Sequence, residues 1–539
     1  MTGAEVFARE LRRRGVRFVA TLCGHGMDPL DDAMEQAGIR LVDVRNEQAA
    51  GLIADATGRL SRQVGVCAVS SGVAHVNALT GVANAHFDGS PMLLVTGCGP
   101  TETIGLEHFQ DFDQLAVANS LCKYVKLIDR PDRIQQYLHN AFSVALTGRP
   151  GPVHLTFPLD VQEAKVTIGV VQIHRPVTKP DALPGPTEIN RIASMLAESE
   201  SPLIIAGNGL FYDKGERALE SFSTTFDVPV VVPVWDRGTV PETMDTFMGV
   251  IGSATGGADL LSNADLILML GARCDYRVGY LQQPEISDHA AIVRVDSDAR
   301  ELDQGMGAHV TVHASPRAFL SDLRTICEGF VPPKIDWMAD AKSRRDTHQK
   351  RVTSAKRPDE GLHALDVVEA IGRVMTRDTT LVIDGGNIGQ WAHQVLCDRY
   401  PGHWLTCGAS GVVGYGIPGA MAARLLDPDR PVILLSGDGA STFTIAELET
   451  ATRQGLPFVM VVADDQSWGI TLTGHEKRYG RGITSELGPI DFVMLARAFG
   501  ALGVRVDTPE GIELAIREAL TAPQPTVIHV PIVKGNPSQ

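Results

Sequence analysis

The chain has 539 residues, of which 44% are hydrophobic and 21% are charged, and its formal net charge is −16. We expect such a chain to fold into several globular domains, because single cores stop growing at about 250–300 residues. The excess of acidic side chains argues against nucleic acid as a partner, since its phosphates would be repelled, and leaves small molecules and other proteins.

The amino-terminal segment, MTGAEVFARELRRRGV, places apolar residues at helical spacing with charges between them. It therefore predicts a first helix and not a signal peptide. No stretch of the sequence has the apolar length needed to cross a bilayer. The eight cysteines are scattered without a CxxC pair, which is typical of reduced thiols. We expect a cytoplasmic protein with no membrane partner.

Alternating strand-like and helix-like segments divide the chain into three blocks, 1–165, 187–330 and 361–539. A Pro-rich connector follows Asp160, and a polar, charged connector that begins KSRRDT precedes the third block. This βα alternation predicts the α/β class, with three doubly wound parallel sheets. The runs expected as strands are RFVATL, RLVDVR, VGVCAVS, MLLVTG and VHLTFP, then LIIAG, VPVVVP, LILMLG and AIVRVD, and finally the opening strand of VIDGGN, PVILLS and PFVMVVA.

The first block contains an acidic residue beside a loop of small residues. Glu47 lies where a strand meets a helix, in DVRNEQAAGLIADATGRL, and 70–89 read SSGVAHVNALTGVANAHFDG. A glutamate in a first helical turn is often only a surface charge that the helix dipole favours. Together with a small, Gly-rich loop that lets a ring approach the backbone, it predicts an aromatic cofactor pocket that contains an acid.

The third block carries two acidic clusters, GDG and DDQS, each at the end of an apolar run. A right-handed crossover would leave both at the carboxyl edge of one sheet, where open α/β sheets bind ligands. Asp464 and Asp465 are adjacent carboxylates, so they either form a solvated turn or share a metal. Glycines on both sides of Asp438 favour a tight turn around an anion, so the sequence predicts a magnesium and diphosphate site.

Five motifs, in register over most of the chain, carry a resemblance to a known family. They are RNEQAAGLIADATGR, SSGVAHVN, FQDFDQ at 109–114, GASGVVGYGIPGAM at 408–421, and GDG followed by DDQSWG. They resemble the thiamine-diphosphate enzymes of the acetolactate synthase and benzaldehyde lyase group. The resemblance implies that the three blocks are a pyrimidine-binding, a middle and a diphosphate-binding domain.

The resemblance also implies a cofactor site. Asp438, Asp465 and the backbone carbonyl of Ser467 would hold Mg²⁺. Val413 would be the apolar wedge under thiamine diphosphate, and the Gly411 carbonyl would accept from its pyrimidine amino group. The residues expected at the diphosphate are Gly386, Asn387, Ile388, Gly439, Ala440 and Ser441.

Glu47 receives a catalytic role from the same resemblance. By sharing a proton with the pyrimidine ring, it would activate the thiazolium carbon as a nucleophile. In the family this glutamate and the diphosphate site come from different subunits. The resemblance therefore implies at least a homodimer and favours a homotetramer.

The substrate pocket is where the chain departs from the synthases of the family. Val73 stands where the SGPG loop of the synthases has proline, and Gly474 stands where they carry tryptophan. At the metal site, Asp465 stands where the family has asparagine. Gln110 would bond the nascent alkoxide, and His25 would relay a proton or be an ordinary loop histidine. The residues expected around the substrate are His25, Val73, Gln110, Ile470, Thr471 and Gly474.

The implied function is a carboligase or lyase that forms or cleaves C–C bonds of 2-oxo acids or acyloins with thiamine diphosphate and Mg²⁺. QSWGITLTGHE resembles benzaldehyde lyase, and MDPLDDAM and TIGLEHFQ resemble sulfoacetaldehyde acetyltransferase. A 2-oxo acid decarboxylase is a further alternative. The departures also leave open a non-catalytic paralogue that binds the cofactor.

The middle block contains GNG at 207–209 and GARCDYRVG at 271–279. These resemble the places where acetolactate synthases hold FAD and oxalyl-CoA decarboxylases hold ADP. Arg273 and Arg277 would be the contacts to such a nucleotide, or else ordinary surface ion pairs. Because the middle domain is empty in many relatives, the resemblance favours a chain without FAD.

Overall fold

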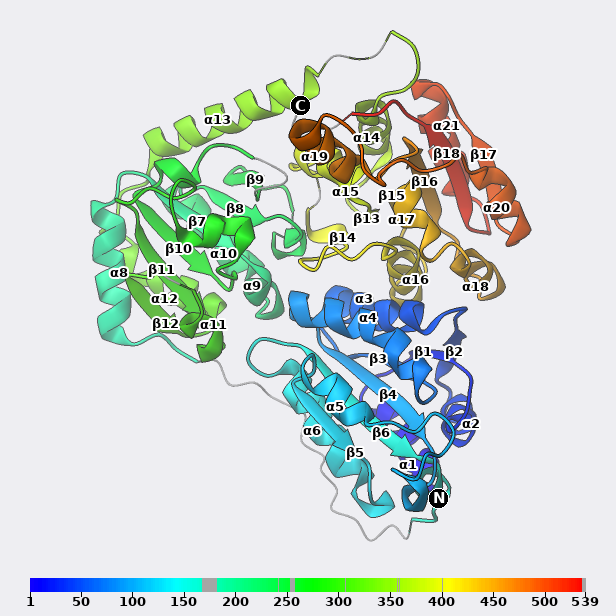
Figure 1. Ribbon diagram of the computed structural model, residues 1–539. Helices are drawn as coiled ribbons and strands as arrows, with labels where there is room; N and C mark the ends of the chain where they lie inside the picture. The colour runs from blue at the N-terminus through cyan, green and yellow to red at the C-terminus, as the bar shows by residue number, and fades with distance from the viewer. Residues whose placement is uncertain are drawn as a thin grey trace.

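The computed structural model describes residues 1–166, 182–240, 242–252, 257–305, 307–355, 357, 359–399 and 401–535. It contains three six-stranded sheets whose strands are all parallel, and Figure 1 shows them as three separate layers with helices between and around them. The predicted α/β class with three doubly wound sheets is confirmed. Most of the connector expected after Asp160 lies at 167–181, outside the described residues.

The first sheet occupies the amino-terminal part of the chain. Its elements are α1 (Gly3–Arg13), β1 (Phe18–Leu22), α2 (Asp28–Gln36), β2 (Arg40–Asp43), α3 (Glu47–Ser61), β3 (Gly65–Val69), α4 (Val73–Asp88), β4 (Met92–Cys98), α5 (Gln114–Asn119), β5 (Tyr124–Leu127), α6 (Ile134–Leu146), β6 (Pro152–Pro158) and α7 (Leu159–Glu163). The strand order is β2-β1-β3-β4-β6-β5. The expected first helix begins at a capping box, in which Thr2 and Glu5 satisfy each other's backbone amides.

The middle sheet follows residue 182. Its elements are α8 (Pro186–Glu198), β7 (Pro202–Ala206), α9 (Asn208–Tyr212), α10 (Glu216–Phe226), β8 (Val230–Pro233), β9 (Phe247–Ile251), β10 (Leu266–Leu270), β11 (Ala291–Asp296), α11 (Ala299–Asp303), β12 (Val310–His313) and α12 (Pro316–Cys327). The strand order is β12-β11-β10-β7-β8-β9, so β7 lies at the centre.

A long helix, α13 (Ile335–Thr353), connects the middle sheet to the third. It takes up the first part of the charged connector that begins KSRRDT, so that segment is largely helical. Met338 and Ala341 pack into the core of the middle domain, and Val352 packs into that of the third. The helix of this connector therefore packs against both domains that it joins (Figure 1).

The third sheet completes the described chain. Its elements are α14 (Ala364–Val374), β13 (Thr380–Asp384), α15 (Gly386–Val395), β14 (Trp404–Thr406), α16 (Gly416–Leu426), β15 (Val432–Gly437), α17 (Asp438–Thr442), α18 (Glu447–Arg453), β16 (Val459–Asp464), α19 (Gly469–Tyr479), α20 (Phe492–Ala498), β17 (Leu502–Arg505), α21 (Pro509–Ala519) and β18 (Thr526–Pro531). The strand order is β14-β13-β15-β16-β18-β17.

The first and third sheets share one hydrophobic cluster. Helix α3 of the first domain packs against α16 of the third, α4 packs against α3, and buried residues from both sheets form a single core. Gly51 and Gly81 make the contact between α3 and α4, where a Cβ on Gly51 would lie 2.6 Å from the Ala78 carbonyl oxygen. This close approach fixes α3, and with it the residue at its amino end, Glu47.

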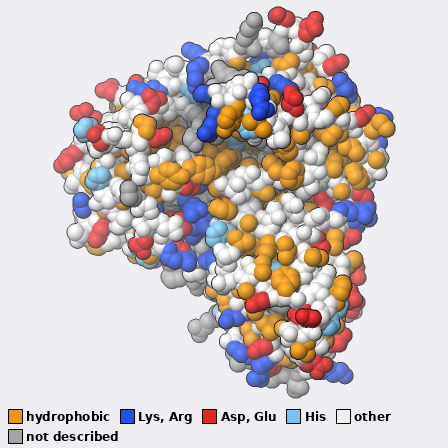
Figure 2. All heavy atoms as spheres, in the orientation of Figure 1, with side chains coloured by type: hydrophobic (Ala, Val, Ile, Leu, Met, Phe, Trp, Pro, Cys, Tyr) orange, Lys and Arg blue, Asp and Glu red, His pale blue; other side chains and the backbone are white. Residues whose placement is uncertain are grey.

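Within the described ranges, no helix is both long and apolar enough to span a membrane. Figure 2 shows that hydrophobic side chains gather on the viewed face over the first domain and the centre of the molecule. Charged side chains lie mostly toward the rim of that view. The viewed face is therefore more apolar at its centre than at its edge.

Candidate active site

The third sheet has a point where the order of its strands reverses direction. From β13 the chain proceeds to β14 on one side, and β15 and β16 follow on the other. Ligands of open α/β sheets bind at such a point, beyond the carboxyl ends of the strands. Gly385, with φ 97°, turns the chain from β13 into α15, and Gly437 leads from β15 into α17. Backbone amides at both helix starts are therefore available to an anion.

A cavity of about 260 Å³ lies at this point of the sheet. The residues predicted from the sequence that line it are Gly386, Asn387, Ile388, Val413, Asp438, Gly439, Ala440, Asp465, Ser467, Ile470 and Thr471. All of these residues belong to the third domain. The structure thus brings together residues from four separate stretches of the sequence that were expected to share one cofactor.

Two buried carboxylates give the cavity its electrostatic character. Burial, together with the charges of Asp465 and Asp464, raises the pKa of Asp438 to about 7, and burial is the larger cause. Burial also raises the pKa of Asp465, against hydrogen bonds from Ser467 and Asn387 that lower it. Among the described residues that line the cavity there is no Lys, Arg or His. These carboxylates therefore have no cationic partner among the described residues of the lining.

Asp464 has a different environment from Asp465. Its Oδ2 lies 2.8 Å from Nε2 of His529, which comes from the neighbouring strand β18. Asp465 instead accepts from the amide and hydroxyl of Ser467, at 3.1 and 2.8 Å. The two carboxylates of the pair thus do not share one metal position, and Asp465 alone lines the cavity.

The chain supplies its own contacts where a diphosphate is expected. Asn387 donates through Nδ2 to Asp465 Oδ2 at 3.2 Å and to the Gly535 carbonyl at 2.7 Å. Ser441 is buried and donates its hydroxyl to the Asp438 carbonyl at 2.7 Å. Gly411, with φ 67°, lies in a turn. Neither Ser441 nor Gly411 lines the cavity, so their roles at the cofactor stay predictions.

Glu47 lies in the first domain, away from this cavity. It is the first residue of α3, its exposed fraction is 9%, and Asn77 donates to its carboxylate at 3.0 Å. Asn46 caps the helix by accepting from the Gln48 amide. The side chain is therefore held in one place at a helix amino terminus, where a negative charge is favoured.

Gln110, Val73 and His25 belong to the carboxyl edge of the first sheet. Gln110, with φ 59°, accepts from the Ser71 hydroxyl at 3.0 Å. Val73 begins α4 and its exposed fraction is 65%. His25 stacks on His108 with ring centres 5.2 Å apart. These three candidates surround the loop 70–73 but line no part of the cavity described above.

Gly474 lies on the exposed face of α19, one turn after Ile470. A Cβ built on it meets no atom within 4 Å. Ile470 lines the cavity and is 41% exposed. Gly474 itself does not line the cavity, and the lining residues on the side of α19 are Trp468, Gly469, Ile470 and Thr471.

Trp468, Ile532 and Asn77 are among the residues at these sites that the sequence did not single out. Trp468 and Ile532 line the cavity, and Asn77 holds Glu47. Trp468 could have been inferred from its position between Ser467 and α19. Ile532 follows the last strand and reaches the site only through the strand order, so no local pattern indicates it.

Comparison with family models identifies the class of protein. The N-terminal TPP binding domain of thiamine pyrophosphate enzymes matches residues 1–117, the central domain matches 189–323, and the C-terminal TPP binding domain matches 384–530. The three matches follow one another in the order of the three sheets. The chain therefore belongs to the thiamine pyrophosphate enzymes, and the expected cofactor class is confirmed.

Curated relatives place the chain more narrowly. It is 28% identical to a probable acetolactate synthase large subunit of Methanocaldococcus jannaschii, covering 99% of this chain and 92% of that one. It is also 28% identical to the acetolactate synthase isozyme 2 large subunit of Escherichia coli, with 99% and 96% covered. The Lactococcus lactis large subunit gives 28%, with 99% and 93% covered. The chain is an enzyme of the acetolactate synthase group, as the resemblance implied.

We predict that Gly439→Ala weakens the affinity for thiamine diphosphate by about tenfold or more, because overpacking costs about 1–3 kcal/mol. A Cβ at this position would lie 2.7 Å from the Trp468 ring, and the rigid indole would have to move into the cavity. The measurement is a titration with thiamine diphosphate and Mg²⁺ that is followed by the tryptophan fluorescence of the protein. Gly488→Ala is the matched control, because a Cβ at this position in the same domain meets no atom within 4 Å. Equal affinities of the two variants would contradict the prediction.

Proposed function

We propose that this chain is a carboligase that joins two 2-oxo acid molecules with loss of CO₂, as acetolactate synthases do, using thiamine diphosphate and Mg²⁺. The observation that carries the proposal is the cavity of about 260 Å³ at the reversal point of the third sheet. It combines glycine-flanked helix starts with two buried carboxylates and an apolar wall, in a chain whose relatives are named acetolactate synthases.

Magnesium is supported by the charges of the cavity. Asp438 and Asp465 are buried carboxylates without a cationic partner among the described lining residues. A diphosphate would add further negative charge, so a hard cation with oxygen ligands is needed beside it. Asp438, Asp465 and the backbone carbonyl of Ser467 supply such oxygens. Since Asp464 is already paired with His529, it adds no further carboxylate to this set.

Each group of residues has a proposed task. When bound, thiamine diphosphate supplies a nucleophilic carbon and accepts the electrons that the departing CO₂ leaves. Glu47 holds a proton at the pyrimidine ring, and Asn77 keeps its carboxylate in position. Val413, which lines the cavity, would pack against the cofactor. Gln110 and His25 orient the substrate oxygen, and Ile470 and Thr471 border the acyl group.

A homodimer is part of the proposal, and a homotetramer would be two such dimers. The lining residues of the cavity all come from the third domain, so Glu47 would reach the cofactor held by a second copy of the chain. Large apolar side chains near the loop 70–73 are exposed in the single chain, among them Val73, Phe109 and Phe112. A second copy would cover such a surface.

A second candidate, cleavage of acyloins, is favoured by the resemblance to benzaldehyde lyase of QSWGITLTGHE, the segment that holds the cavity residues Ile470 and Thr471. Acyloin cleavage needs no decarboxylation step. The two candidates share the cofactor site and differ only in what the substrate side accepts.

A proton-NMR time course separates the two candidates. The protein with thiamine diphosphate and Mg²⁺ is supplied with pyruvate and an aromatic acyloin together. We expect loss of pyruvate and appearance of acetolactate. Release of aldehyde with pyruvate untouched would favour the lyase, and acetaldehyde from pyruvate alone would indicate a decarboxylase. No change in either compound would support a non-catalytic paralogue and overturn the proposal.

A further inference from the structure

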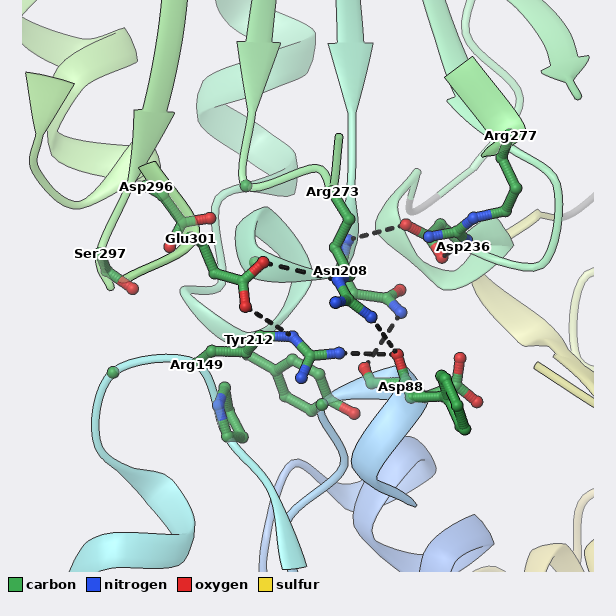
Figure 3. Close-up of a pocket in the computed structure, with 16 residues that line it drawn as sticks. Asp88, Arg149, Asn208, Tyr212, Asp236, Arg273, Arg277, Asp296, Ser297 and Glu301 are labelled. Carbon is green, nitrogen blue, oxygen red and sulfur yellow. Dashed lines mark hydrogen bonds and ion pairs between the residues drawn. The ribbon is translucent and has the colours of Figure 1, made fainter. Parts of the chain in front are cut away.

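The middle sheet also has a point where its strand order reverses, between β7 and β10. The crevice beyond the carboxyl ends of these strands faces the first domain, and Figure 3 shows the residues that line it. Open α/β sheets bind nucleotides at such points. The motifs GNG and GARCDYRVG, which raised FAD as a candidate, lie here.

The backbone closes the crevice from within. The Gly209 amide donates to the Gly271 carbonyl at 2.8 Å, and the Gly207 amide donates to the Leu270 carbonyl at 3.0 Å. A Cβ on Gly209 would lie 2.7 Å from Cα of Gly271, so the two loops touch through their main chains. The amides that a pyrophosphate would need are already used. The remaining cavity is about 20 Å³, which is room for about one water molecule.

Charged side chains from two domains fill the rest of the crevice (Figure 3). Arg149 of the first domain and Arg273 of the middle domain both lie against Glu301, with Nε to carboxylate distances of 3.7 and 3.5 Å. The other nitrogens of Arg149 donate to the carbonyls of His86 and Phe87, at 2.9 and 2.6 Å. The arginines are thus directed at the protein and not at an open cleft.

Arg277 is fully engaged as well. Its guanidinium donates to Asp236 at 2.7 Å, to Asp275 at 2.9 Å and to the Val234 carbonyl at 3.1 Å. The Arg277 side chain is 2% exposed. It could reach a phosphate only by leaving a buried carboxylate unpaired, which costs several kcal/mol. The FAD contact expected of this residue therefore does not fit its surroundings.

The charge balance of the crevice also opposes a nucleotide. Its lining carboxylates are Asp88, Asp236, Asp296 and Glu301, against three arginines. A diphosphate would bring further negative charge to a lining in which carboxylates already outnumber arginines. The carboxylates pair instead with arginines of the same chain, as Asp236 does with Arg277 and Glu301 does with Arg149 and Arg273.

We infer that this crevice is a closed joint between the first and middle domains, filled by its own charged side chains, and that the chain holds neither FAD nor another nucleotide there. The joint includes a hydrogen bond from Asn208 to the Asp88 carbonyl at 3.4 Å. It also includes one from the Arg149 amide to Asp298 at 2.9 Å. The ion pairs hold the domains where a dinucleotide would otherwise lie.

The test uses the full chain purified with thiamine diphosphate and Mg²⁺ from cells supplied with riboflavin. Heat release followed by flavin fluorescence and nucleotide chromatography is expected to give no stoichiometric flavin or adenine nucleotide. Addition of FAD or ADP is expected to leave the apparent Tm unchanged. One flavin per chain, or a rise in Tm with either compound, would overturn the inference whether or not the protein makes acetolactate.

A variant tests the joint itself. Glu301→Gln leaves Arg149 and Arg273 without their shared carboxylate and is expected to lower the apparent Tm by roughly 5 °C or more. Arg324→Gln is the control, because its ion pair with Glu328 lies at the surface of the same domain and is expected to change Tm by less than about 2 °C. An equal Tm for Glu301→Gln and the unsubstituted chain would contradict the joint. If that variant is insoluble, the release and Tm measurements on the unsubstituted protein decide.

Discussion

Glu47→Gln is expected to reduce kcat by about 100- to 10,000-fold, the usual contribution of a positioned acid or base. The amide keeps the size of the side chain and its contact with Asn77, but it cannot exchange a proton with a pyrimidine ring. The fold and the affinity for thiamine diphosphate are expected to stay unchanged. The measurements are the rate of acetolactate formation, the apparent Tm and a cofactor titration.

The matched control for this variant is Glu35→Gln, which neutralises an exposed carboxylate of α2 in the same domain. We expect it to have the activity of the unsubstituted chain. Full activity in Glu47→Gln would remove Glu47 from the mechanism. A large fall in Tm would instead mean that the carboxylate is needed for the fold.

Asp438→Asn is expected to weaken the joint binding of thiamine diphosphate and Mg²⁺ by about 100-fold or more, since even indirect metal contacts are worth 10- to 100-fold. The variant removes the carboxylate at the start of α17, and with it half of the charge that a dication would neutralise. Calorimetric titration of the cofactor in the presence of Mg²⁺ measures the change. An unaltered Kd would contradict the assignment.

Asp429→Asn is the control for Asp438→Asn, because it removes an exposed carboxylate of the same domain and should leave Kd unchanged. Co-expression of Glu47→Gln chains with Asp438→Asn chains then tests the shared site. About half of the dimers would be mixed, and each mixed dimer would contain one intact site out of two. About one quarter of the activity of the unsubstituted protein should therefore return. No recovery from folded, mixed dimers would mean that both residues act within one chain.

The sequence predicted the interior strands of the sheets better than their edges. Runs such as LILML and VILLS are buried on both faces, so their composition alone marks them. The strands that it did not predict include β5, β9, β12, β14 and β17, and each lies at the edge of its sheet. The edge strand β17 is largely exposed and carries no continuous apolar run, whereas β9 and β14 are buried and were missed although they are apolar. The interior strand β18 is an exception, since its buried run Thr526–Pro531 could have been recognised.

The site was predictable where its residues lie beside glycines at strand ends. Asp438, Gly386 and Ser467 each follow such a strand, and the strand order brings them together. The pairing of Asp464 with His529 was not predictable, because β18 is 65 residues away and becomes a neighbour only in the sheet. The same holds for the closed crevice, since the spacing of Arg149 and Glu301 along the chain says nothing of their contact.

The core that the first and third sheets share changes what the three blocks of sequence mean. Neither sheet has a complete interior of its own, because α3 of the first domain and α16 of the third cover each other. A fragment that ended after β6 would expose that face and would aggregate more readily than fold. The block boundaries visible in the sequence therefore mark changes in the sequence pattern and do not mark units that fold independently. Substitutions in α3 and α16 are constrained by each other, although more than 350 residues separate them along the chain.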